Sequence, residues 1–162
     1  MESMNCYNIP QFWGCSMAIF NPSREEARRF LFEAWRKYHV SEPLTGLESM
    51  AVQVIAMHSE YHSVMDAPER YIEQEYFPEM GETNPFLHMS LHLSILEQLS
   101  IDQPPGIVAN YRELVRRSGE HDAQHAVMEC LAEVVWRAQR DRAAPDGAAY
   151  VQCLKNRVDG KN

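Results

Sequence analysis

The stretch NPFLHMSLHLSILEQLS, residues 84–100, predicts a helix with two histidines on its inner side. Asn84 precedes Pro85, and proline is favoured at the first position of a helix because its missing N–H would be unpaired there anyway. Four polar residues fall on one arc of this helix: Ser90, Ser94, Glu97 and Gln98. His88 and His92 are four residues apart and lie roughly opposite that arc, so we expect both imidazoles to face the interior.

A second pair of histidines with the same spacing occurs in EHDAQH, residues 120–125. His121 and His125 lie at the edge of the apolar arc of a predicted long helix, and Glu129 continues the same line one turn on. Neighbouring helices would bring four imidazoles and one carboxylate together, and imidazole is a common ligand for Zn and Fe. The sequence therefore predicts a site for one divalent ion, expected to be Zn or Fe. Its predicted ligands are His88, His92, His121, His125 and Glu129.

The same histidines have a second interpretation, in which they are hydrogen-bonded residues at the edge of the core and bind no metal. A third pair with this spacing, His58 and His62, receives no metal role, because His58 is near a helix end where a cation complements the helix dipole. Glu48 is predicted to be a capping residue.

The sequence leaves open whether the protein is an enzyme and which small molecule it acts on. Three histidines and one open position on Zn would activate water for hydrolysis, whereas Fe with a carboxylate would allow redox chemistry. Glu129 is the candidate general base. The H-E-x-x-H and Glu-x-x-His patterns are absent from the sequence, as are the phosphate-binding and dinucleotide-binding glycine motifs. The alternative function is a non-catalytic interaction module or a homodimer, suggested by nine Met and three Trp residues.

Apolar residues recur at helical spacing through most of the chain, and no stretch alternates as a strand would. Capping boxes are predicted at Ser23 with Glu26 and at Thr45 with Glu48. The expected fold is all-α, a bundle of four main helices with additional short helices. Helices are predicted from each of the two capping boxes and over residues 68–76, 84–100, 107–117, 120–140 and 148–158.

The length of 162 residues predicts one helical domain, over residues 19–158. Residues 1–18 are expected to be a disordered N-terminal extension and residues 159–162 a tail. Met17 is a candidate natural start. The net charge of −8 argues against nucleic acid and anionic membranes as partners, and no apolar run is long enough to span a membrane.

The four cysteines show no C-x-x-C spacing, so we expect a cytoplasmic protein with reduced thiols. Cys130 and Cys153 fall in helical sequence and are predicted to be buried structural thiols.

Long blocks of the chain resemble a bacterial family known as domain of unknown function 1841. The blocks are FNPSREEARRF (20–30), EPLTGLESMAVQVIAMHSEYH (42–62), NPFLHMSLHLSILEQLSIDQPPG (84–106) and EHDAQHAVMECL (120–131). The resemblance covers roughly Ile19 to Leu154 and implies a small helical bacterial protein. It implies no activity, and the four predicted histidine ligands lie inside the matching blocks.

Overall fold

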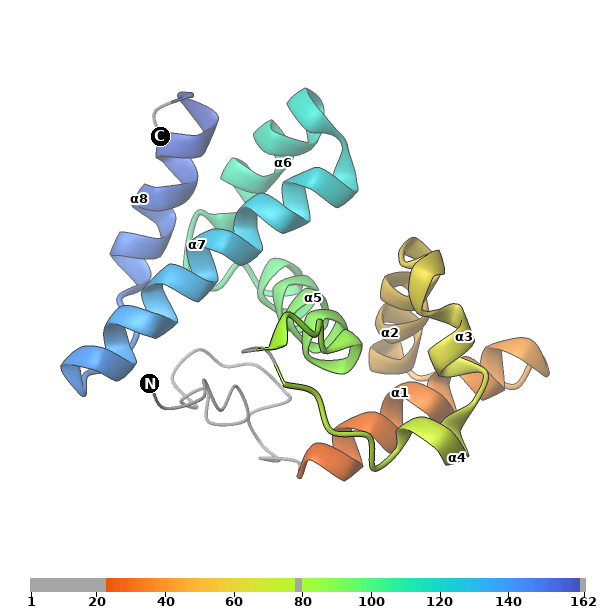
Figure 1. Cartoon of the computed structure of the whole chain (residues 1–162). Helices are drawn as coiled ribbons and strands as arrows, with labels where there is room; N and C mark the ends of the chain where they lie inside the picture. The colour runs from red at the N-terminus through yellow and green to blue at the C-terminus, as the bar shows by residue number, and fades with distance from the viewer. Residues whose placement is uncertain (1–22, 78–79, 161–162) are drawn as a thin grey trace. The chain divides into compact units, whose positions relative to one another are not determined.

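The computed structural model describes residues 23–77 and 80–160, and within them it contains eight α-helices, one 3-10 helix and no strand (Figure 1). The predicted all-α class is therefore confirmed. The predicted N-terminal extension lies outside the described residues. The elements are α1 (Arg24–His39), α2 (Gly46–Met57), η3 (Ser59–Tyr61), α3 (His62–Met65), α4 (Pro68–Tyr71), α5 (Pro85–Ser100), α6 (Ile107–Ser118), α7 (Glu120–Asp141) and α8 (Gly147–Val158).

The described chain divides into two compact units, and the boundary falls inside α5, after Leu93. The first unit holds α1 to α4 and the first half of α5, and the second holds the remainder of α5 with α6, α7 and α8. The expected bundle of four main helices is not confirmed by this division. A single domain over residues 19–158 remains a prediction.

Helix α1 of the first unit begins as predicted. The Ser23 side chain accepts a hydrogen bond from the Glu26 N–H, and the Glu26 carboxylate accepts one from the Ser23 N–H, so the capping box is complete. Helix α2 packs against α1 and starts with the matching box at Thr45 and Glu48. On the buried face of α1, the Trp35 indole N–H donates to Asp66 Oδ1 at 2.8 Å and thereby fixes the segment after α3.

The buried side chain of Arg28 joins three elements of the first unit. Its guanidinium donates hydrogen bonds to the carbonyl oxygens of Tyr71 and Ile72 at 3.0 and 2.8 Å, and it lies 4.5 Å from the ring centroid of Phe86 at the start of α5. Helix α4 ends at Tyr71, five residues before the predicted end at Tyr76. The carbonyl oxygens of Tyr71 and Ile72 face Arg28, and the Tyr71 oxygen accepts its next backbone bond from the Gln74 N–H, three residues on, as in a turn. This arrangement gives a physical reason for the early end.

The three long helices of the second unit pack against one another in pairs. Cys130 on α7 and Cys153 on α8 form a disulfide, so the prediction that both are free thiols was wrong. Their separation of 23 residues in the chain carried no recognisable spacing, and only the pairing of α7 with α8 brings the two sulfurs together. The buried hydroxyl of Tyr150 on α8 donates to Gln98 Oε1 at 3.0 Å.

The polar arc predicted for α5 does not mark a solvent-exposed side. Glu97 and Gln98 are 6% and 4% exposed, so this helix is covered on its predicted outer side as well. Gln98 fits there because its side-chain oxygen accepts the hydrogen bond from Tyr150, which offsets the cost of burying an amide.

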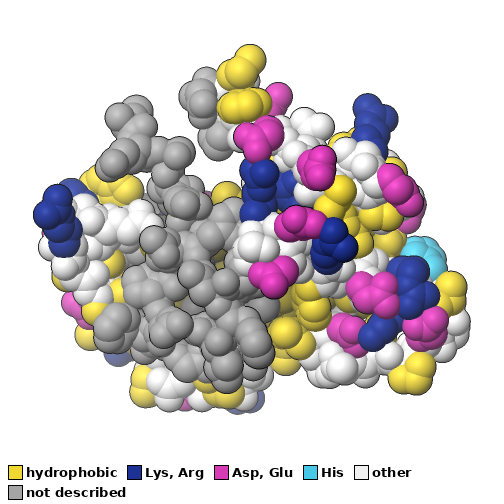
Figure 2. All heavy atoms as spheres, turned by 90° about the horizontal axis from the view of Figure 1, so that it is seen from below, with side chains coloured by type: hydrophobic (Ala, Val, Ile, Leu, Met, Phe, Trp, Pro, Cys, Tyr) yellow, Lys and Arg dark blue, Asp and Glu magenta, His cyan; other side chains and the backbone are white. Residues whose placement is uncertain are grey.

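The surface of the described helices carries opposite charges in close proximity. In the view of Figure 2, Lys and Arg side chains lie beside Asp and Glu side chains. Arg36, for example, bridges Glu33 and Glu42, each at 2.8 Å. Such exposed pairs contribute little to stability. Among the described helices none is long and apolar enough to cross a membrane.

The disulfide generates a stability prediction. Replacing Cys153 by Ser, or reducing the protein, is expected to lower the free energy of unfolding by about 3 kcal/mol, because the cross-link no longer restricts the unfolded chain. Urea unfolding with and without dithiothreitol measures this. The Cys153→Ser variant is its own control, since reductant should change its unfolding curve no further. Equal curves for the oxidised and reduced wild type would contradict the disulfide's stabilising role.

The start of α2 generates a pH prediction. Hydrogen bonds from the Lys37 ammonium, at 2.6 Å, and from the Thr45 N–H lower the pKa of Glu48. A carboxyl whose pKa is lowered by folding stabilises the protein above its unfolded pKa of about 4.3, and this stabilisation is lost as the pH falls through the folded value. Glu48→Gln keeps the capping geometry but removes the charge. In urea unfolding at pH 7 the variant should therefore have a lower free energy of unfolding than the wild type, and this difference should shrink below pH 4. A constant difference would contradict this assignment.

Candidate metal centre

The first half of α5 supplies two of the histidines that the sequence singled out. Asn84 begins the helix, because its side-chain oxygen accepts hydrogen bonds from the N–H groups of Phe86 and Leu87, each at 3.1 Å. One turn further on His88 is half-buried, and after a second turn His92 is fully buried. The burial of His92 agrees with the expected inward orientation, and the two ring centroids are 4.8 Å apart.

The third histidine, His58, is the residue that ends α2. Its backbone leaves the helical conformation, with φ −119° and ψ 68°, and its side chain is completely buried. Its Nδ1 atom lies 2.7 Å from the carbonyl oxygen of Val54, one turn back in α2. Since a carbonyl oxygen only accepts hydrogen bonds, Nδ1 carries the proton, and Nε2 is the nitrogen that carries the lone pair in the neutral ring.

The Nε2 atoms of these three histidines converge. His88 Nε2 lies 3.0 Å from His58 Nε2 and 3.2 Å from His92 Nε2. The ring centroids of His58 and His92 are 4.5 Å apart, which closes the triangle. We call His58, His88 and His92 the histidine triad.

These distances match those between ligands of one metal ion. Two nitrogens that each lie about 2.0–2.1 Å from a zinc ion are about 3.3 Å apart at the tetrahedral angle and about 2.9 Å apart at a right angle. Both contacts of the triad fall within that interval. The imidazole ring of His58 also meets a usual requirement for a ligand, because its second nitrogen donates to a backbone carbonyl and thereby fixes the tautomer.

Hydrogen bonds within the triad also have such distances, with one restriction. A ring nitrogen offers either one N–H or one lone pair in the plane of the ring. His88 Nε2 faces two nitrogens, and it can complete a full hydrogen bond with only one of them. An ion placed between the three atoms would accept all three lone pairs at once.

One aromatic residue borders the triad. The ring of Tyr61 in η3 is nearly parallel to that of His58, with centroids 5.7 Å apart, and meets His88 edge-on at 5.8 Å. Burial raises the pKa of Tyr61, so the phenol is protonated at neutral pH. His62 is excluded from the triad, because its Nε2 lies 3.0 Å from the carbonyl oxygen of Ile55.

The other predicted ligands lie on α7, in the second unit. His121 and His125 are both half-buried, with ring centroids 4.4 Å apart, as their spacing predicted. Their participation in one site with His88 and His92 stays a prediction. Glu129 is exposed, and its carboxylate lies 2.6 Å from Arg157 on α8. Its role as a ligand or general base stays a prediction.

His58 was not among the predicted ligands and was expected only to complement the helix dipole. A spacing of four residues identifies pairs on one helix, whereas His58 lies beyond the last helical residue of α2 and meets its partners from another element. One signal was present: His58 follows the apolar residues of α2 at helical spacing, and a histidine on the inner face needs a buried partner.

The fold and the triad define an all-α protein with a buried cluster of histidines suited to a metal ion. A family comparison adds the identity of the group: the chain belongs to the family described as domain of unknown function 1841, whose sequence pattern matches residues 23–156. That range includes every histidine of the triad. No curated protein and no solved structure matches the chain.

The hydrogen bond to Val54 generates a prediction that does not require bound metal. His58 should carry its proton on Nδ1 both with and without zinc, because the carbonyl oxygen accepts it in either state. Two-bond nitrogen–proton correlation spectra of histidine-labelled protein distinguish the tautomers, and His39, exposed at the end of α1, serves as the reference ring. A proton on Nε2 of His58 would contradict the assignment and leave the triad without its first ligand.

Proposed function

We propose that the protein binds one divalent metal ion through the Nε2 atoms of His58, His88 and His92. The observation that supports this is that His88 Nε2 lies 3.0 Å from His58 Nε2 and 3.2 Å from His92 Nε2, with His58 coming from a separate element. Two of the three imidazoles, those of His58 and His92, are fully buried.

The proposal retains a contribution from α7. A further imidazole, from His121 or His125, would complete a tetrahedral set, and this part of the proposal rests on their helical spacing. Four imidazoles would make a closed structural site, whereas three would leave a position for water or substrate. The single-residue variants described below distinguish the two arrangements.

The set of ligands favours zinc over iron. Non-haem iron sites that activate oxygen combine two histidines with a carboxylate, whereas the group of candidate ligands found among the described residues contains histidines alone. Zinc held by three imidazoles lowers the pKa of a bound water to about 7 and supplies a nucleophile at neutral pH. We therefore infer a zinc-dependent hydrolytic activity in preference to redox chemistry.

Metal analysis of protein purified without a nickel column tests the proposal. We expect about one equivalent of zinc per chain in the wild type. Each of His58→Ala, His88→Ala and His92→Ala should weaken binding by more than about 100-fold, which exceeds the effect of losing an outer-shell partner. His121→Ala and His125→Ala show which α7 imidazole participates. Chelation should lower the melting temperature, because a ligand that binds only the folded state stabilises it.

His39→Ala is the matched control, since it removes an exposed imidazole outside the triad and should leave the zinc content unchanged. Circular dichroism of every variant separates loss of a ligand from loss of the fold. Zinc absent from the folded wild type, and not taken up in a competition titration, would end the proposal and favour the alternative of hydrogen-bonded histidines in a non-catalytic helical protein.

A further inference from the structure

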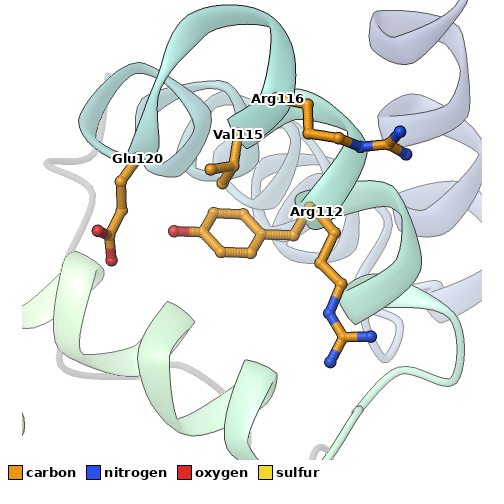
Figure 3. A pocket seen from close by; sticks show the side chains of 5 residues that line it. Arg112, Val115, Arg116 and Glu120 are labelled. Carbon is orange, nitrogen blue, oxygen red and sulfur yellow. The ribbon is translucent and has the colours of Figure 1, made fainter.

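A pocket separate from the triad lies in the second unit, between α6 and the first residue of α7 (Figure 3). Its volume is about 600 Å³, within the range of sites that hold small molecules. Four of its lining residues follow one face of α6 and the fifth begins α7. They are Tyr111, Arg112, Val115, Arg116 and Glu120. We call it the α6–α7 pocket.

The phenol of Tyr111 is held in place by a fully buried neighbour. Gln124 on α7 is 0% exposed, and its side-chain nitrogen donates to the Tyr111 hydroxyl at 3.5 Å. Burial raises the pKa of Tyr111, and the negative charge of Glu120 acts in the same direction. The hydroxyl is therefore protonated at neutral pH.

Two opposite charges border the pocket without an ion pair inside the described part of the chain. These are the guanidinium of Arg112 and the carboxylate of Glu120, and Figure 3 shows them on opposite sides of the pocket. Arg116 differs, because its guanidinium is bound to Glu113 one turn back in α6. The wall between the two charges is apolar, formed by the Tyr111 ring and Val115.

From this arrangement we propose that the α6–α7 pocket binds a small zwitterionic amino compound. The ligand's carboxylate pairs with Arg112, which presents a planar pair of donors suited to it. Its ammonium group pairs with Glu120, and the hydrocarbon between them packs on Tyr111 and Val115. A phosphate or other polyanion fits less well, because Glu120 would repel it. An uncharged apolar ligand would leave both charges without a counter-ion.

Three probes of one length test the charge requirement: 6-aminohexanoate, hexanoate and hexylammonium. Backbone amide shifts in nitrogen–proton spectra of the full-length, oxidised protein report where each one binds. We expect saturable shifts in residues of α6 and the start of α7 for 6-aminohexanoate. Hexanoate and hexylammonium should bind roughly fivefold more weakly, because each of them loses one exposed ion pair. Equal binding of the three probes, or shifts that do not saturate, would overturn the proposal.

Charge-removing variants assign the two ends of the ligand. Arg112→Gln should weaken 6-aminohexanoate binding roughly fivefold and leave hexylammonium binding unchanged. Glu120→Gln should also weaken 6-aminohexanoate binding roughly fivefold, but it should leave hexanoate binding unchanged. Arg137→Gln is the matched control, because Arg137 is exposed on α7 and pairs with Glu133 away from the pocket. Arg112 and Glu120 are both exposed, so the two variants should fold. Affinity for 6-aminohexanoate that stays unchanged in both variants would refute the assigned contacts.

Discussion

The hydrogen bond from His58 Nδ1 to the Val54 carbonyl is the constraint on which the candidate metal centre depends. It fixes both the tautomer and the direction of an imidazole that has left its helix. With Nδ1 committed to the end of α2, only Nε2 remains to face α5. The α5 histidines need no such anchor, because the helix itself sets their separation. The site thus consists of two histidines held at a fixed spacing by α5 and a third, His58, whose ring is oriented by a hydrogen bond to a backbone carbonyl.

Local signals predicted most of the helices. The capping boxes at Ser23 and Thr45 fixed where α1 and α2 begin, and proline at position 85 fixed the start of α5. These signals work because each concerns groups within four residues of one another. The inward face of His88 and His92 was predictable for the same reason, since it follows from helical periodicity alone.

What the sequence did not reveal depends on contacts between distant segments. The early end of α4 depends on Arg28, more than forty residues earlier in the chain. The burial of Gln98 depends on Tyr150, and the Cys130–Cys153 bond depends on the pairing of two helices. The role of His58 needed knowledge of which face of α5 it meets. In each case the deciding interaction joins elements whose pairing no local pattern encodes, so periodicity and capping rules could not have found it.

The disulfide encloses the turn between α7 and α8. That turn is exposed from Arg142 to Ala144, and Arg142 itself has a positive φ of 49°. Exposed turns of small residues are where proteases cut folded chains most readily. A trypsin nick after Arg142 would therefore fall inside the covalent ring, and the two fragments would travel as one molecule until a reductant separates them. The redox state of Cys130 and Cys153 thus decides whether a cut at this turn divides the molecule into two.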